Sequence, residues 1–157
     1  MRYRRTWQPG GTYFFTVNLA DRSSNLLVAA VDTLREVVRI VKARHPFDIL
    51  AWVAMPDHLH VLWTLPDGDS DNAMRWALIK SGFSRHMPPG EQVAASRLRK
   101  GERGIWQRRF WEHLITDEAD LSHHFDYIHI NPVKHLHAQR ASDWPHSSIH
   151  RYIRAGW

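Results

Sequence analysis

The sequence predicts an α+β fold: a ferredoxin-like sandwich with a central antiparallel sheet of about four strands and helices packed on it. Two observations lead to this prediction. Short runs rich in β-branched and aromatic residues alternate with longer segments whose apolar residues recur every three or four positions. The resulting order is strand, helix, strand, strand, helix, strand, helix, which is that of a split βαβ arrangement with one added helix.

The first half of the chain supplies three predicted strands and one helix. Residues 12–18 are aromatic and β-branched and follow two glycines, which predicts a first strand. Apolar residues at three- and four-residue spacing over 31–43 predict an amphipathic helix. The apolar runs 47–55 and 58–64 are separated by a single Pro-Asp pair, so we expect two adjacent antiparallel strands.

The second half continues with a helix, a polar excursion and a fourth strand. Residues 71–86 are expected to be helical, with Leu78 and Phe83 among the residues that face inward. The segment 91–103 is polar, basic and weakly periodic, which indicates a loop excursion rather than a boundary between domains. The fourth strand is expected within 105–115.

A long helix is expected next, from Thr116 to about Ile130. Thr116 is suited to cap its first turn, and the acidic residues that follow suit the positive end of the helix dipole. Pro132 is expected to mark its end. From about residue 138 the chain forms a C-terminal tail, which Trp144 and Tyr152 are expected to hold on the core.

Length and composition limit the class of protein. The chain has 157 residues with 43% hydrophobic content, which fits a single domain over 1–157 with its own core. Because there is no cysteine, disulfides, thiolate metal sites and cysteine nucleophiles are excluded. No apolar run approaches the roughly 20 residues that span a bilayer, and the basic N-terminus does not lead into an apolar signal core. We therefore expect a cytoplasmic protein without a membrane partner.

The charge balance favours a polyanionic partner. Lysine and arginine exceed aspartate and glutamate by 21 − 16 = 5, and the sequence pI is about 10.0. A small basic protein is also simply well solvated, but here the basic residues cluster, and tryptophans lie among them. This arrangement suits phosphate neutralisation and base stacking, although tryptophan is also an ordinary core residue. The candidate DNA contacts are Arg2, Arg4, Arg5, Arg97, Arg99, Lys100, Arg103, Trp106, Arg108, Arg109 and Trp111.

A pair of histidines lies in the third predicted strand. His58 and His60 are separated by one residue, so strand geometry sends both imidazoles to the same face, while Leu59 and Val61 pack on the other. Two neighbouring imidazoles can bind a divalent metal ion. Strand histidines are also often only hydrogen-bonded, but polar side chains in an apolar run need a partner that offsets their desolvation.

The last predicted helix carries a second constellation. Tyr127 and Asn131 are four residues apart and so share one face of the helix, which His124 extends by one turn. Leu121, Phe125 and Ile128 fall on an adjacent face and are expected to anchor the helix to the sheet. Tyr127 could thus approach the strand histidines. The alternative is a tyrosine at the margin of the core and an asparagine that caps a helix before a proline.

Four segments of the chain resemble the REP-associated tyrosine transposases, which belong to the HUH enzymes (histidine, hydrophobic, histidine). The segments are MPDHLHVLW (55–63), WQRRFWEH (106–113), YIHINPVK (127–134) and DWPHSS (143–148). They stand in the order found in the family, and the resemblance covers almost the whole chain. It implies one HUH transposase domain with the fold described above.

The resemblance implies a role for each matching position. His58 and His60 match the pair that binds Mg²⁺ or Mn²⁺, and Tyr127 matches the nucleophile. Asn131 matches the helix position that supplies a third, oxygen-bearing metal ligand. Lys134 lies in the third segment and joins the candidate DNA contacts.

The resemblance also implies an activity and a partner. Family members bind repetitive extragenic palindromes as single-stranded hairpins and cleave or rejoin DNA nearby. The chain is therefore expected to be a nucleoid-associated, metal-dependent single-strand endonuclease and strand transferase that forms a 5′-phosphotyrosine. Related insertion-sequence transposases are dimers that exchange helices, whereas a monomer is favoured for REP-associated members.

Two other functions and one departure from the family remain to be weighed. A protein of the same fold could bind DNA hairpins without cleaving them. A metal-dependent phosphodiesterase could use water as its nucleophile, with a structural Tyr127. The departure is Leu136, where relatives commonly have glycine, so the sequence leaves the exit from the last helix open.

Overall fold

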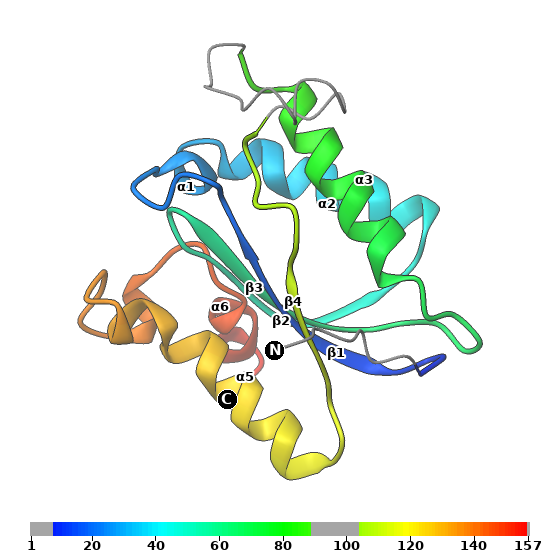
Figure 1. The fold of residues 1–157 in the computed structure, drawn as a ribbon. Coiled ribbons are helices and arrows are strands. Elements are labelled where there is room, and N and C mark those ends of the chain that lie inside the picture. Colours follow the sequence, from blue (N-terminus) through cyan, green and yellow to red (C-terminus); the bar gives the residue numbers. More distant parts are fainter. Residues whose placement is uncertain (1–7, 89–103, 157) are drawn as a thin grey trace, which may run out of the picture.

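The centre of the molecule is a four-stranded antiparallel sheet with the order β2-β3-β1-β4 (Figure 1). The computed structural model describes residues 8–88 and 104–156. The strands are β1 (Thr12–Asn18), β2 (Asp48–Ala54), β3 (His58–Thr64) and β4 (Trp111–Leu114). The helices are α1 (Leu26–Ala29), α2 (Val31–Arg44), α3 (Asn72–Arg85), α5 (Glu118–Lys134) and α6 (Ile149–Arg154), with a 3-10 turn η1 at Ala141–Asp143.

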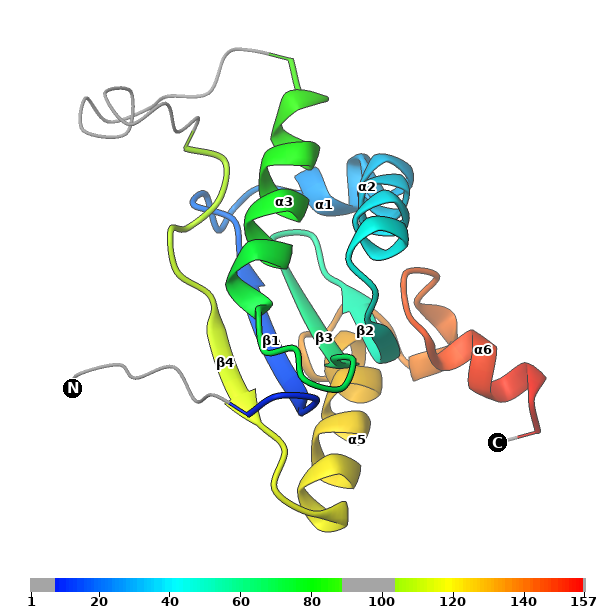
Figure 2. The same ribbon diagram turned by 90° about the vertical axis from the view of Figure 1, so that its right-hand side faces the viewer.

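Helices cover both faces of this sheet. Figures 1 and 2 show α2 and α3 on one face and α5 on the other. Because β1 leads through α2 to β2, and β3 leads through α3 to β4, each crossover joins strands that have one antiparallel strand between them. This is the ferredoxin-like arrangement, and the predicted α+β fold is confirmed.

The larger core lies between the sheet and the pair α2 and α3. Strand residues such as Phe15 and Trp63 point to this side and meet Trp76 and Phe83 of α3. The inward position predicted for Phe83 is confirmed, but the one predicted for Leu78 is wrong, because that side chain is 37% exposed. The apolar residues of α3 lie on two neighbouring faces of the helix, one with Phe83 and one with Leu78. The approach of α2 decides which of these faces is buried.

Helix α2 packs tightly against Gly82 of α3. A Cβ atom at this position would lie 2.8 Å from Cγ1 of Val37, which real Cβ atoms essentially never do. The absence of a side chain therefore lets the two helices pack together. This contact turns the buried face of α3 toward α2 and leaves the opposite side in solvent.

A second, smaller core lies between the sheet and α5. It contains Phe14 of β1, Leu62 of β3 and Ile128 of α5, with Leu121 and Phe125 packed against it. The predicted anchoring face of the last helix is thus confirmed. Its position fixes how the neighbouring face, which carries Tyr127, is turned toward the sheet.

The fourth strand is shorter than the sequence predicted. Of the expected 105–115, the strand covers only Trp111–Leu114, and Trp106 forms an isolated bridge with Leu19. In one continuous strand, Arg108 would face the same side as the buried Trp106 and Phe110. Because burying a guanidinium is costly, a break in the strand that leaves Arg108 exposed is favourable.

Both predicted ends of the last helix need correction. The cap is Asp117, whose side chain accepts a hydrogen bond from the Asp120 backbone N–H at 2.8 Å, and not Thr116. Pro132 lies inside the helix, which ends at Lys134. Because proline has no backbone N–H, only one helix carbonyl loses its hydrogen-bond donor. The cost is limited further because the helix ends two residues later, at Lys134.

The C-terminal tail covers the edge of β2. The Ala54 N–H donates to the His146 carbonyl at 2.9 Å, and the Ser148 N–H donates to the Trp52 carbonyl at 3.0 Å. Trp144 Nε1 donates to the Ala54 carbonyl at 3.0 Å, and the Tyr152 hydroxyl donates to Leu50. The packing role predicted for Trp144 and Tyr152 is confirmed, and it protects backbone groups that an edge strand would expose.

Among residues 8–88 and 104–156, none of the helices combines the length and the apolar composition needed to cross a bilayer.

Candidate functional site

Both strand histidines point from β3 toward α5. His58 and His60 are 6% and 4% exposed, and their ring centroids are 4.8 Å apart. Leu59 and Val61 belong to the core on the opposite face, as the alternation of a strand requires. The prediction that the two imidazoles lie together on one face is confirmed.

Each imidazole is oriented through its Nδ1 atom. His58 Nδ1 lies 2.9 Å from Oδ1 of Asp57, and His60 Nδ1 lies 2.9 Å from the Thr16 hydroxyl. Asp57 in turn accepts a hydrogen bond from Arg22 Nε at 2.6 Å. Although burial opposes ionisation, these hydrogen bonds from Arg22 and His58 lower the pKa of Asp57. Because Nδ1 is engaged in both rings, Nε2 is the atom left for a metal ion.

His60 is held in its neutral form. Burial lowers its pKa to about 3, and coulombic interactions with His58, His135 and Lys134 act in the same direction. A neutral imidazole keeps the lone pair that a metal ligand needs. The Phe14 ring, which stacks on His60 at 5.4 Å, contributes to this apolar environment.

Helix α5 brings its tyrosine and asparagine to the histidines. The ring centroids of Tyr127 and His60 are 5.2 Å apart, and Phe14 contacts the edge of Tyr127 at 5.9 Å. Asn131 is fully buried. The spacing of four residues therefore places both side chains over the same end of β3, and the approach expected of Tyr127 is confirmed.

The surroundings of Asn131 fit a metal ion. Its Oδ1 lies 3.4 Å from Nε2 of His58, and within the described part of the chain its Nδ2 has no hydrogen-bond partner. Since Nδ1 of His58 faces a carboxylate, Nε2 and Oδ1 both present lone pairs. Two ligand atoms of an ion with bonds of about 2.1 Å lie roughly 3.0 to 3.4 Å apart, which matches this separation.

Lys134 and His135, which follow Asn131 in the chain, also border the site. Lys134 Nζ lies 4.8 Å from the centroid of the Tyr127 ring, and the His135 ring is 5.6 Å from that of His58. Burial lowers the pKa of His135, and the charges of His58 and Lys134 add to this effect. His135 follows Asn131 by four residues and so lies on the same helix face. It was not predicted as a site residue because the helix was expected to end near Ile130, whereas α5 ends at Lys134.

The candidate DNA contacts fall into three groups. Trp111 is 51% exposed on β4, and Arg108, Arg109 and Lys134 are exposed too. Trp106 is 6% exposed and packs against Phe83 in the core, where an unpaired base cannot reach its face. The remaining candidates, Arg2, Arg4, Arg5, Arg97, Arg99, Lys100 and Arg103, lie outside the described residues.

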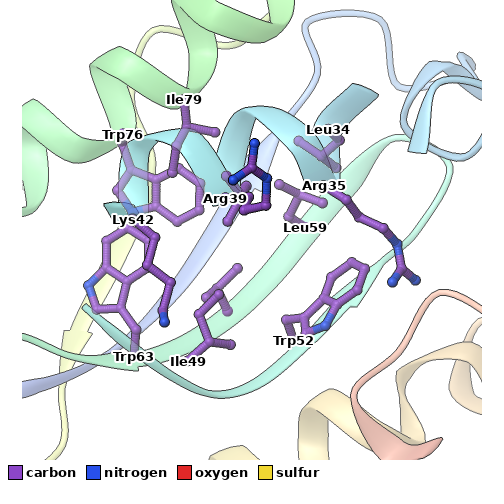
Figure 3. A pocket seen from close by; sticks show the side chains of 12 residues that line it. Leu34, Arg35, Arg39, Lys42, Ile49, Trp52, Leu59, Trp63, Trp76 and Ile79 are labelled. Carbon is purple, nitrogen blue, oxygen red and sulfur yellow. The ribbon is translucent and has the colours of Figure 1, made fainter. Parts of the chain in front are cut away.

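An apolar cavity of about 290 Å³ lies on the other face of the sheet, between α2, α3 and β3 (Figure 3). Its lining includes Leu59, Val61 and Trp63, which alternate along β3 with the histidines. The sheet therefore separates this cavity from the histidine pair, and it takes no part in the candidate site.

Comparison with known proteins identifies close relatives. A REP-associated tyrosine transposase of Escherichia coli is 46% identical over 98% of this chain and 86% of its own length. A Haemophilus influenzae protein provisionally assigned to the same family is 44% identical over 98% of this chain and 88% of its own length. No protein-family model matches the chain.

Solved structures agree with this relationship. A REP-associated tyrosine transposase bound to a REP hairpin is 46% identical, covers 99% of this chain and 87% of its own, and gives a TM-score of 0.85. A Deinococcus radiodurans protein, provisionally described as a transposase, shares 18% identity over 82% of this chain and 95% of its own, with a TM-score of 0.50. At that identity the second likeness concerns the fold alone.

Proposed function

The chain belongs to the REP-associated tyrosine transposases, and on that premise we propose that it cleaves and rejoins single-stranded DNA beside palindromic, REP-like hairpins through a covalent bond to Tyr127. The observation that carries the proposal is the 5.2 Å separation of the Tyr127 and His60 rings. The Tyr127 ring and the two imidazoles thus lie on the same side of β3, which supports a role for Tyr127 as the nucleophile beside a metal site.

The metal site is assigned to His58, His60 and Asn131, with Mg²⁺ or Mn²⁺ as the ion. Two imidazole nitrogens and one amide oxygen form a neutral ligand set, which leaves the charge of the ion available to a phosphate. When bound, the ion would polarise the scissile phosphate and stabilise negative charge on the leaving oxygen. Asp57 and Thr16 hold the two rings in the orientation that this requires.

Tyr127 is assigned as the nucleophile. Its hydroxyl oxygen forms a bond to phosphorus while the bond from phosphorus to the 3′ oxygen breaks. The phenolic proton passes to solvent, and the leaving oxygen takes up a proton to give a free 3′-hydroxyl. The ester bond to Tyr127 replaces the broken bond to the 3′ oxygen, so the phosphodiester energy is conserved. The hydroxyl of another strand can therefore reverse the attack and join two DNA ends without nucleotide hydrolysis.

Lys134 and the neighbouring basic residues are assigned to DNA binding. The ammonium group beside the Tyr127 ring places positive charge where the scissile phosphate must lie. Arg108 and Arg109 just before β4, and Trp111 at its start, provide exposed guanidinium and indole groups. Phosphate contacts of this kind orient the DNA, and stacked aromatic rings hold unpaired bases.

Contacts within one molecule support a single chain as the active form. Tyr127 and Asn131 of α5 lie against the histidines of β3 in the same molecule. We therefore propose a monomer as the active form, in which α5 need not be exchanged with a second copy.

The test is incubation of the protein with single-stranded DNA that carries candidate palindromes and Mg²⁺ or Mn²⁺, followed by denaturing gel electrophoresis. A covalent protein–DNA adduct is expected, and both Tyr127→Phe and His58→Ala should abolish it. Tyr152→Phe is the matched control, because this tyrosine holds the tail on β2, away from the histidines.

The other outcomes separate the remaining functions. Cleavage that survives Tyr127→Phe would assign the nucleophile to water and the protein to the metal phosphodiesterases. Tight hairpin binding without cleavage, over a range of palindromes and both ions, would assign a binding protein of the same fold.

A further inference from the structure

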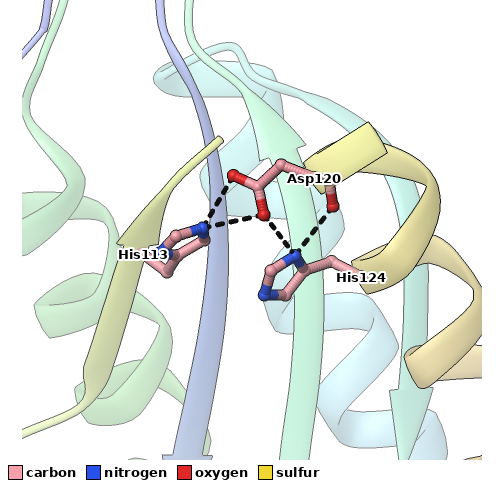
Figure 4. A group of neighbouring side chains, drawn as sticks. All are labelled: His113, Asp120 and His124. Atoms are coloured by element: carbon pink, nitrogen blue, oxygen red, sulfur yellow. Dashed lines mark hydrogen bonds and ion pairs between the residues drawn. The ribbon is translucent and has the colours of Figure 1, made fainter. Parts of the chain in front are cut away.

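A second group of metal-ligating side chains lies near the start of α5. His113 comes from β4, whereas Asp120 and His124 lie one turn apart on α5. Figure 4 shows all three turned toward one another, and one potential ligand atom from each lies within 4.8 Å of the others. The Phe14 ring lies between this group and the first site, since it contacts both His124, at 4.7 Å, and His60.

The distances within the group suit a single ion. His113 Nε2 lies 2.8 and 3.0 Å from the two carboxylate oxygens of Asp120. His124 Nδ1 lies 3.0 Å from Oδ1 of the same carboxylate and 2.8 Å from the backbone carbonyl oxygen of Asp120, so an ion would replace these contacts. The two imidazole rings stack with centroids 4.6 Å apart and planes inclined by 22°. These nitrogens already converge on one carboxylate, so an ion can enter through small side-chain movements.

The carboxylate at the centre is itself oriented. Its Oδ2 accepts hydrogen bonds from the Thr116 backbone N–H at 2.9 Å and from the Thr116 hydroxyl at 3.2 Å. Although burial opposes ionisation, these bonds and the nearby His113 lower the pKa of Asp120. A carboxylate that is ionised and fixed by hydrogen bonds from a neighbouring residue is typical of metal centres.

The ligand chemistry indicates the class of ion. Two imidazoles with one carboxylate suit Zn²⁺ and similar transition metals. Three protein ligands leave at least one coordination position for water or a substrate oxygen. The exposure of the group is intermediate, so an ion can reach it from solvent.

We propose that His113, Asp120 and His124 form a second metal site, which binds a transition-metal ion of the Zn²⁺ class. The ion connects the edge strand β4 to the first two turns of α5. Since Tyr127 follows His124 by three residues on this helix, the ion restrains the segment that presents the tyrosine to the histidine pair. The site does not depend on the DNA-cleavage proposal, because its ligands are distinct from those assigned there.

Isothermal titration of the EDTA-treated full-length protein with Zn²⁺ tests the site. A His58→Ala/His60→Ala variant removes the first histidine pair, and we expect it to bind one Zn²⁺ ion. Adding His113→Asn or Asp120→Asn should lower the remaining affinity by about tenfold or more. Cobalt(II) added to the same variant should give the visible absorption of a nitrogen and oxygen site of low coordination number, which Asp120→Asn should abolish.

His123→Asn is the matched control, because this exposed histidine precedes His124 on the same helix and is not one of the three ligands. It should leave the Zn²⁺ affinity unchanged. Circular dichroism in EDTA shows whether each variant is folded. If His113→Asn does not fold, Asp120→Asn still tests the site, because asparagine has nearly the size of aspartate and keeps one oxygen that accepts hydrogen bonds. Failure of the His58→Ala/His60→Ala variant to bind Zn²⁺ at micromolar concentration would overturn the proposal, as would equal affinities in the His123→Asn and Asp120→Asn variants.

Discussion

Asn131 Oδ1 lies 3.4 Å from His58 Nε2 in a fully buried position, while Asn131 Nδ2 has no hydrogen-bond partner within the described part of the chain. An unpaired buried amide nitrogen costs free energy. A metal ion between the oxygen and the imidazole offsets this cost, because it binds both lone pairs at once. The relationship therefore leads directly to a test of the metal site.

Asn131→Leu is expected to weaken Mn²⁺ binding by about tenfold or more, since it removes an oxygen ligand while roughly keeping the volume of the side chain. Asn131→Asp should retain binding, because a carboxylate oxygen replaces the amide oxygen. Titration followed by electron paramagnetic resonance measures both affinities. An unchanged affinity in Asn131→Leu would mean that the amide oxygen only accepts a hydrogen bond from His58 Nε2.

The stability of the metal-free protein should fall below neutral pH. The unfolded chain binds a proton at His60 near the ordinary pKa of 6.5, whereas burial lowers the folded-state pKa to about 3. Stability is therefore full above 6.5 and is lost as the pH falls from 6.5 toward 3. Between pH 7 and pH 5 the loss from this one group is about 2 kcal/mol.

Urea unfolding in EDTA, at several pH values, measures this loss. The His60→Gln variant should show a shallower dependence of the free energy of unfolding on pH, whatever its absolute stability. The lowered pKa of His129, which also results from burial, acts in the same direction and remains in the variant. Identical pH dependence in both proteins would contradict the assignment to His60.

Replacing Leu136 by glycine should stabilise the protein. Leu136 has a φ of 62° and is 91% exposed, so it adopts the left-handed conformation just after α5 without burying its side chain. The following N–H, of His137, donates to the Pro132 carbonyl at 2.9 Å and closes the helix end. Glycine adopts this conformation without the Cβ clash, so we expect a gain of about 1 kcal/mol.

Thermal unfolding measures the gain. Leu136→Gly is expected to raise Tm by roughly 2 to 4 °C for a chain of this size. Leu136→Ala should leave it nearly unchanged, because alanine keeps the Cβ atom and therefore the strain. A lower Tm for the glycine variant would mean that the leucine side chain makes a contact that outweighs the strain.

The two tryptophans near β4 should respond differently to truncation. Trp111→Ala removes an exposed indole, so we expect single-stranded hairpin affinity to fall roughly tenfold or more while Tm changes little. Trp106→Ala removes a core side chain, and the free energy of unfolding should fall by about 3 to 5 kcal/mol.

Fluorescence anisotropy with a labelled hairpin and urea unfolding separate these effects. The variant Trp111→Phe should recover part of the affinity, since it keeps an aromatic face. Hairpin affinity that is the same in Trp111→Ala as in the unmodified protein would remove this residue from the proposed DNA surface.

Some features of this protein follow from the sequence because they depend only on local backbone geometry. A strand repeats every two residues, so His58 and His60 share a face wherever the strand lies. A helix brings residues four apart together, so Tyr127 and Asn131 are neighbours before any tertiary contact forms. The order of strands and helices follows from the same two periods, and the resemblance of four segments supplied the chemistry that periodicity cannot.

Other features were decided by contacts between distant segments. The buried face of α3 depends on the approach of α2 at Gly82, whereas local spacing alone favoured Leu78 together with Phe83. Only the packing of α5 on the sheet, where Tyr127 meets Phe14, brings Tyr127 to His60. These pairings are set by the burial of both sheet faces, a free energy that belongs to the whole chain and to no short segment of it.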